Sequence, residues 1–228
     1  MVLFTPKMKL ADIIISNPSV LLILQRFHID LGFGEKNVTE VCRISGVSEK
    51  FFLLICNVYT NDQYLPSIDE LCVTDMSSLV PYLIASHNYY LDERIPHIEK
   101  HLDRIADACP KNHKEILQRF FHDYKAEVQN HFLYEEKIVF PYIENLSNGD
   151  YGSGYSINQF EKNHSNIEDK LNDLTNIIIK YLPGNIMPKE RISVLFDIFQ
   201  LSNDLNKHCL IEEKILIPYV EIIERSQR

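Results

Sequence analysis

The sequence contains little glycine and no cysteine pattern of the kind that builds a zinc ribbon or a disulfide framework. Only 7 Gly occur in 228 residues, which argues against the many tight turns of a β-sandwich or barrel. The 5 Cys are odd in number and no Cys-x-x-Cys is present. We therefore expect isolated, reduced thiols, as in a reducing cytosol.

An excess of positive charge and long apolar runs are also missing. The formal net charge is −9, which repels phosphate backbones and anionic membranes, so neither nucleic acid nor a membrane is an expected partner. No window approaches the roughly 20 apolar residues of a membrane helix. Asp12 and Asn17-Pro18 interrupt the apolar N-terminal stretch, which is a poor signal peptide. The sequence predicts a soluble, cytoplasmic protein.

The chain is rich in helix-forming sequence. From about residue 76 to the C-terminus, apolar residues recur at steps of three and four in four successive patterns. Breaks at Cys109-Pro110, Asn148–Asp150 and Leu182–Asn185 separate these patterns. We expect an all-α fold in which residues 76–228 form an up-down-up-down four-helix bundle.

Three prolines lie inside these patterns or near their ends, namely Pro96, Pro141 and Pro218. Each is expected to kink or end its helix, because proline lacks the backbone N–H and its ring clashes with the preceding turn.

The first 60 residues read as a separate, small helical module. Short apolar stretches are punctuated by Gly32, Gly34 and Gly46, and Ser48 is a candidate N-cap for a helix that follows it. Residues 61–75 are expected to be a linker.

A repeat of the second half of the chain points to a duplicated two-helix unit. Asn130–Glu144 (NHFLYEEKIVFPYIE) matches Lys207–Glu221 (KHCLIEEKILIPYVE) at an offset of 77 residues, 208 − 131. The same offset, 164 − 87, relates His87 to His164. Each half therefore carries one His, then a second His, and a Glu four residues after the second.

These repeated residues are candidates for a metal site. All six fall on the predicted apolar seams: His87, His131, Glu135, His164, His208 and Glu212. Buried carboxylates are costly and repel one another unless cations compensate them. A His and a Glu at i and i+4 face one centre, and imidazole with carboxylate suits iron better than thiolate-rich sites do. A single His on an apolar seam is more often a satisfied core residue, but the duplication favours two metal ions, with carboxylates as bridges.

Other polar residues near the repeats are predicted to have different environments. Glu136 and Glu213 lie one step off the seam, and we expect them to face solvent and pair with a neighbour. His97 and His101 are also spaced i, i+4, but they lie off the seam near Pro96, so surface positions are expected.

The pattern of His, then His-x-x-x-Glu, given twice, resembles hemerythrin-like HHE cation-binding domains over about Met76–Ile223. It is similar in particular to the RIC family of di-iron proteins for the repair of iron centres. This resemblance implies that the six candidate residues hold two non-haem iron ions, oxo- and carboxylate-bridged. The first module resembles the family's ScdA-type N-terminal domain, but Asp30–Glu35 lacks the adjacent cysteines that relatives carry there.

The resemblance implies a stress-response role in the repair of iron-sulfur clusters damaged by nitric oxide or oxidants, by iron donation to iron-sulfur proteins. It also suggests a homodimer formed through the first module. Two alternatives stay open, because they use the same ligands. One is binding or sensing of O2 or NO, and the other is a di-iron oxidoreductase that reduces nitric oxide. A structural, partner-binding helical protein is a third alternative, and it predicts no stoichiometric metal.

Overall fold

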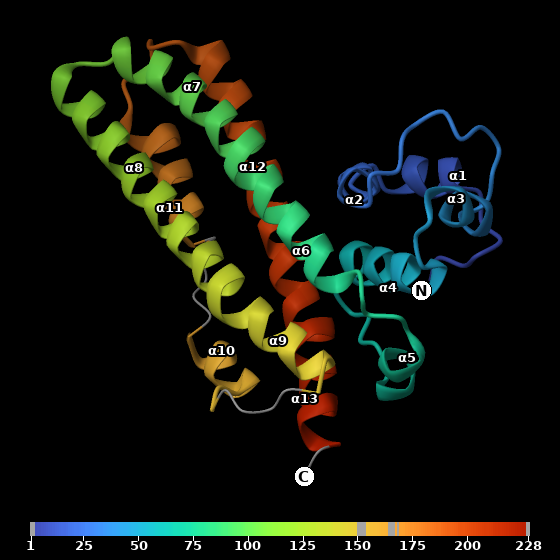
Figure 1. Cartoon of the computed structure of the whole chain (residues 1–228). Coiled ribbons are helices and arrows are strands. Elements are labelled where there is room, and N and C mark those ends of the chain that lie inside the picture. The colour runs from blue at the N-terminus through green and yellow to red at the C-terminus, as the bar shows by residue number, and fades with distance from the viewer. Residues whose placement is uncertain (1–2, 150–153, 164–166, 168, 227–228) are drawn as a thin grey trace. The chain divides into compact units, whose positions relative to one another are not determined.

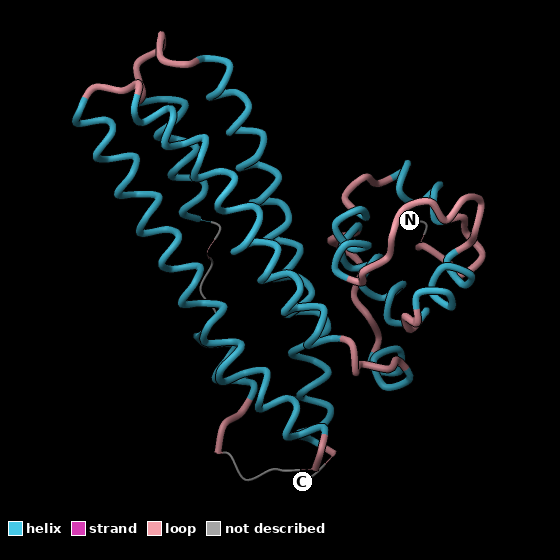
Figure 2. Tube along the Cα trace, turned by 45° about the horizontal axis from the view of Figure 1, so that its top comes forward, coloured by secondary structure: helices cyan, strands magenta, loops and turns pink. Residues whose placement is uncertain are grey.

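Every regular element in the described part of the chain is a helix. The computed structural model describes residues 3–149, 154–163, 167 and 169–226, and Figure 2 shows helices joined by loops, without a strand in these ranges. This confirms the predicted all-α fold. No helix within these ranges is long and apolar enough to cross a membrane.

The chain divides into two compact units, and the boundaries between them fall inside helices. The first unit comprises Met1–Ser86 and Lys207–Arg228, and the second unit comprises His87–Asn206. The two boundaries lie within α6 (Leu79–Asn88) and α12 (Pro188–Ile211). The boundaries expected from the sequence, at residues 60 and 76, stay a prediction.

The first unit begins with short helices whose ends follow local capping chemistry. Its first four helices are α1 (Leu10–Ser16), α2 (Val20–Arg26), α3 (Val38–Ser45) and α4 (Glu49–Thr60). Asn37 and Glu40 form a reciprocal capping box at the start of α3, and Gly46 ends it with φ of 68°. The Ser48 hydroxyl accepts a hydrogen bond from the Phe51 amide, which confirms the predicted N-cap of α4.

The core of the first unit is aromatic. Phe27 packs against Phe51, Phe52 and Tyr82, with ring centroids 5.0 to 5.7 Å apart. Arg26 is buried and lies over the Tyr82 ring at 5.8 Å. A desolvated cation–π contact of this kind is worth up to about 2 kcal/mol, which explains how a guanidinium can be tolerated in this core.

Three cysteines in the N-terminal part of this unit form no disulfide, as expected. Cys42 and Cys56 are buried, and Cys72 is exposed. Burial raises the pKa of Cys42 to about 12, with a smaller contribution from the nearby Glu49 carboxylate. A thiol with so high a pKa is a poor nucleophile and a poor metal ligand at neutral pH.

The segment expected to be a linker contains a short helix, α5 (Ile68–Val73), capped by Ser67. It is also fastened to the C-terminal part of the chain. The Lys214 ammonium donates to the carbonyls of Asp62, at 2.6 Å, and Tyr64, at 3.1 Å. The first unit closes with η4 (Glu212–Leu216) and α13 (Ile217–Arg225), and α13 contacts α5.

The second unit contains the long helices α8 and α12 and several shorter helical segments. In chain order its elements are η1 (Tyr89–Arg94), α7 (Ile95–Asp107), α8 (Lys111–Tyr134), η2 (Glu135–Val139), α9 (Phe140–Ser147), α10 (Ile157–Asn163), α11 (Asp169–Asn176), η3 (Ile177–Tyr181) and α12 up to Asn206. The chain reverses at Cys109-Pro110, so α7 and α8 lie side by side as an antiparallel hairpin (Figure 1). The apolar residues Ile98, Leu102 and Ile105 of α7, and Leu117 and Val128 of α8, are buried.

At each of the three prolines the helical run does not stop. Instead, a π-helical segment precedes the proline. The segments η1, η2 and η4 precede Pro96, Pro141 and Pro218, which occupy the first turns of α7, α9 and α13. A π-turn adds one residue to the helix, so it shifts the hydrogen-bond pattern ahead of the residue that cannot donate. The duplicated sequence therefore contains the same local irregularity twice. Such segments often occur at functional sites.

Candidate metal centre

The candidate ligands lie near the junctions at which an α-helix is followed by a π-helical segment. His131 lies in the last turn of α8, and Glu135 is the first residue of η2. In the repeat, His208 lies in the last turn of α12, and Glu212 is the first residue of η4. His87 is near the end of α6. His164 lies outside the described residues, so its predicted role stays a prediction.

Glu135 presents each of its two oxygens to a different imidazole. The Nε2 atom of His87 lies 3.0 Å from Oε2 of Glu135, and the Nε2 atom of His131 lies 2.9 Å from Oε1. The side chains of His87 and Glu135 are 0% exposed, and that of His131 is 8% exposed. One carboxylate thus lies between two ring nitrogens in a site closed to solvent.

The repeat reproduces half of this geometry. The Nε2 atom of His208 lies 3.2 Å from Oε1 of Glu212, four residues later, and both side chains are buried. The match with His131 and Glu135 follows from the i, i+4 spacing, which places the two residues on one face of the helix.

Both units contain buried candidate ligands. His87 and Glu135 of the second unit, and His208 and Glu212 of the first unit, are buried, and each offers a ligand atom to a metal ion. In the second unit, His131 also contacts Glu135.

Glu136 has a role that the sequence did not predict. Its Oε1 atom lies 2.8 Å from Nδ1 of His87, and its side chain is 37% exposed. The sequence predicts that Glu136 faces solvent and pairs with a neighbour. The structure shows that its neighbour is a buried candidate ligand. The only signal in the sequence was the repeated acidic pair, Glu135-Glu136 and Glu212-Glu213.

This contact determines which nitrogen of His87 is available to a metal. An ionised carboxylate can only accept a hydrogen bond, so Nδ1 of His87 carries the proton and donates it to Glu136. In the neutral ring, Nε2 then carries a lone pair and points toward Glu135. A lone pair facing a carboxylate at this distance needs a cation or a proton between them. Carboxylate partners of this type orient metal-binding imidazoles and raise their basicity.

We expect Glu136→Gln to weaken metal binding by about 10- to 100-fold, because the amide holds the His87 ring less firmly and lowers its basicity. Equilibrium dialysis against a buffered ferrous solution would measure the change in affinity. Glu144, an exposed residue of α9, gives a matched control, and Glu144→Gln should bind as the wild type does. An unchanged affinity in Glu136→Gln would show that the contact with His87 does not orient a ligand.

Aromatic residues form the surroundings of His87. Phe132 is fully buried and stacks on the imidazole, with ring centroids 4.0 Å apart and an interplanar angle of 12°. Phe140 lies beside the same ring at 5.6 Å. These rings exclude water, which strengthens electrostatic interactions inside the site.

A pair of tyrosines lies close to Glu135. The hydroxyls of Tyr134 and Tyr155 are 2.8 Å apart. Burial, followed by the hydrogen bond to Tyr134, raises the pKa of Tyr155, and the Glu135 carboxylate contributes a smaller increase. Tyr155 is therefore neutral at physiological pH, and it adds no negative charge to the site.

The donor set fits a hard or borderline divalent cation. It consists of imidazole nitrogens and carboxylate oxygens, without a thiolate. A buried carboxylate such as Glu135 or Glu212 would be costly without positive charge beside it. Imidazole and carboxylate together are the usual ligands of non-haem iron in helical bundles. The fold and the site thus define a helical protein with a buried His/Glu metal site.

The comparison with protein families identifies the family to which this helical metal-binding protein belongs. The model of the hemerythrin HHE cation-binding domain matches residues 80–221. This range is more than half of the chain, and the chain belongs to that family. A search among curated proteins finds no match. A hemerythrin HHE domain with a buried His/Glu cluster indicates a non-haem iron-binding protein.

Proposed function

We propose that His87, His131, Glu135, His164, His208 and Glu212 hold two iron ions, and that the protein donates iron for the repair of iron-sulfur clusters damaged by nitric oxide or oxidative stress. The observation that carries the proposal is the position of Glu135, whose two oxygens face two different imidazoles. A carboxylate in that position can bridge two metal ions, one beside each ring. Glu212 would make the equivalent bridge in the other half of the repeat.

Bound iron would supply a redox-active centre with coordination positions for small ligands, since six protein groups do not fill two coordination shells. The protein residues orient the ligands and exclude water. Glu136 holds His87 in the tautomer that presents Nε2, and Phe132 fixes the plane of the ring. Burial keeps water from competing with the ligands.

Iron donation is favoured by the chemistry of the ligands. Ferrous ion lies near the weak-binding end of the divalent transition-metal series, and a site without thiolates holds it less firmly than a cysteine-rich acceptor does. An ion bound by nitrogen and oxygen can therefore pass to a cluster whose ligands are cysteines. The resemblance of the first module to the N-terminal domain of repair proteins supports the same direction.

Binding or sensing of a diatomic gas is a second candidate. It is favoured by the stacked rings of Phe132 and Phe140 beside His87, because an apolar and water-free surface admits a small, uncharged ligand such as O2 or NO.

An isotope-transfer experiment tests the proposal. The chain is loaded with ⁵⁷Fe and incubated without oxygen with a [4Fe–4S] enzyme that nitric oxide has inactivated. Iron donation predicts recovery of the enzyme with ⁵⁷Fe in its cluster, and less recovery with an equal amount of free ferrous ion. Retention of all ⁵⁷Fe by the chain, with reversible spectral changes on adding NO or O2, would contradict donation and support gas binding.

A further inference from the structure

Helix α12 carries apolar side chains on two opposite faces. One face belongs to the core of the second unit, where Val194 and Ile198 are fully buried. On the other face, Ile192 is 58% exposed, Phe196 is 71% exposed and Phe199 is 50% exposed. A surface helix normally has one apolar and one polar face, and a helix that is apolar on both sides is normally covered on both. The outer face of α12 thus has the composition of a buried surface, although it is exposed in the single chain.

The exposed apolar side chains form one stripe. Ile192, Phe196 and Phe199 follow one another at steps of four and three residues, so they lie along one side of the helix. Asn203 continues this spacing by a further four residues and is also exposed. Alternating steps of four and three form the seam along which one helix packs against another. These four residues are called the outer stripe below.

The repeat shows that the fold does not require apolar residues at these positions. Helices α8 and α12 are both 24 residues long, and they are related by the 77-residue offset of the repeat, 188 − 111. The positions of α8 that correspond to the outer stripe are occupied by Glu115, Arg119, His122 and Ala126. On α8, Glu115 and Arg119 form exposed ion pairs with Lys111 and Asp123. The apolar stripe is therefore particular to α12 and is not explained by the packing of the two-helix unit.

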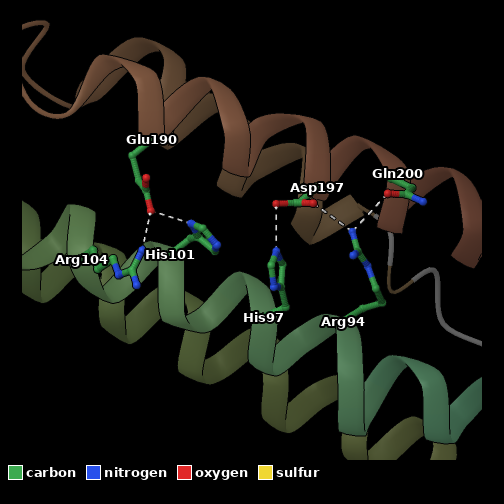
Figure 3. A network of polar contacts seen from close by, with 7 residues as sticks. All are labelled: Arg94, His97, His101, Arg104, Glu190, Asp197 and Gln200. Carbon is green, nitrogen blue, oxygen red and sulfur yellow. Dashed lines mark hydrogen bonds and ion pairs between the residues drawn. The ribbon is translucent and has the colours of Figure 1, made fainter.

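The charges on α12 favour a second copy of this chain as the partner of the outer stripe. The formal net charge of the chain is −9, so two copies repel one another at long range. On α12, all of which the structure describes, the exposed positions in residues 192–206 are uncharged. The carboxylates of Glu190 and Asp197 point toward α7, where Arg104 and Arg94 bind them (Figure 3). Two copies can therefore meet at this face without bringing like charges together.

We propose that the outer stripe is the interface of a homodimer, in which the α12 helices of two copies pack antiparallel about a twofold axis. Such an axis places the same surface on both sides of the interface. With the axis between Phe196 and Phe199, the ring of Phe196 in each copy lies opposite Phe199 of the other copy. Ile192 of one copy then lies opposite Asn203 of the other, at the ends of the seam.

The exposed area agrees with a weak but specific dimer. An aromatic side chain buries about 150 to 250 Å², so the exposed parts of Ile192, Phe196 and Phe199 offer roughly 350 Å² in each copy. Homodimer interfaces are about 65% apolar, which gives a total buried area of roughly 1,100 Å² for the pair. This value lies near the lower limit of about 1,000 Å² for a specific interface. We expect a dissociation constant of about 1 to 100 μM.

Sedimentation equilibrium of the full chain over a range of concentrations tests the proposal. The measurement requires no iron, so its outcome is independent of the proposed function. Phe196→Glu should raise the dissociation constant of the dimer by more than about 100-fold, because it places two like charges at an apolar interface. Arg119→Glu makes a larger change of charge at the corresponding position of α8, and it should keep the wild-type constant. Well below the dissociation constant the chain is monomeric, and there Phe196→Glu should unfold in urea as the wild type does.

Mixing two variants tests whether the outer stripe contacts itself. Phe196→Glu and Phe199→Lys should each be monomeric alone, and an equal mixture should dimerise at least about 10-fold more tightly, because the new carboxylate and ammonium face one another across the axis. The proposal is overturned if the wild type is monomeric up to about 1 mM, or if the mixture associates no better than either variant. A dimer that persists unchanged in Phe196→Glu would also overturn it, since the interface would then lie on another surface.

Discussion

Replacing Glu135 with alanine is expected to abolish the binding of both iron ions, with a loss of affinity of more than about 100-fold. Both oxygens of Glu135 face ring nitrogens of candidate ligands, at 3.0 Å from His87 and 2.9 Å from His131. A single substitution therefore removes an oxygen from the surroundings of both imidazoles. Loss of a residue that supports a ligand already costs 10- to 100-fold in affinity, and loss of the ligand itself costs more. Elemental analysis of anaerobically purified protein measures the iron per chain.

The same variant separates a metal-binding role from a purely structural one. Iron at 1,000 times its dissociation constant should stabilise the wild type by about 4 kcal/mol, and it should not stabilise Glu135→Ala. Glu144→Ala changes an exposed residue of α9, so it should keep the wild-type iron content and stabilisation. Retention of two iron ions by Glu135→Ala would refute the assignment of Glu135 as a ligand.

Phe132→Ala should lower the free energy of unfolding of the metal-free protein by about 3 to 5 kcal/mol. The ring of Phe132 is fully buried and stacks on both His87, at 4.0 Å, and Tyr90, at 5.7 Å. Its removal leaves a cavity beside a candidate ligand and takes away the surface that holds the imidazole in plane. Urea denaturation, followed by circular dichroism, measures the change.

A matched control for this substitution lies on α12. Phe196 is 71% exposed, so Phe196→Ala should change the free energy of unfolding by less than about 0.5 kcal/mol. If the two substitutions had equal effects, the account of Phe132 as the packing support of His87 would be wrong.

Much of the fold follows from short-range patterns in the sequence. The breaks at Cys109-Pro110 and Leu182–Asn185 separate helices as predicted, because proline and glycine act locally on the backbone. The pairing of His131 with Glu135, and of His208 with Glu212, follows from helical spacing alone. Because the pairs recur in a duplicated unit, the sequence predicts that both bind metal, which a single pair would not indicate.

The π-helical segments could not be predicted in the same way. A π-turn inserts one residue into the helical repeat, and a pattern of apolar residues at steps of three and four does not reveal such an insertion. The prolines indicated an irregularity, but the sequence does not distinguish a kink from a π-turn. The difference matters here, because η2 and η4 begin at Glu135 and Glu212 themselves.

Contacts between different helices also could not be predicted from the sequence. Glu136 reaches His87 across 49 residues of chain, and His101 reaches Glu190 across 89. Each contact depends on how far one helix is shifted along another, which is determined by side-chain packing and not by periodicity. His97 and His101 were expected at the surface. They are partly exposed, and they lie in an organised network with α12.

The account depends on the presence of two cations among the buried imidazoles and carboxylates. Diffraction from crystals of the iron-loaded chain, collected on both sides of the iron absorption edge, tests it most directly. We predict two anomalous peaks, one on each side of the Glu135 carboxylate and each within bonding distance of a histidine Nε2. A map without an anomalous peak beside Glu135, from protein that had been saturated with iron, would contradict it.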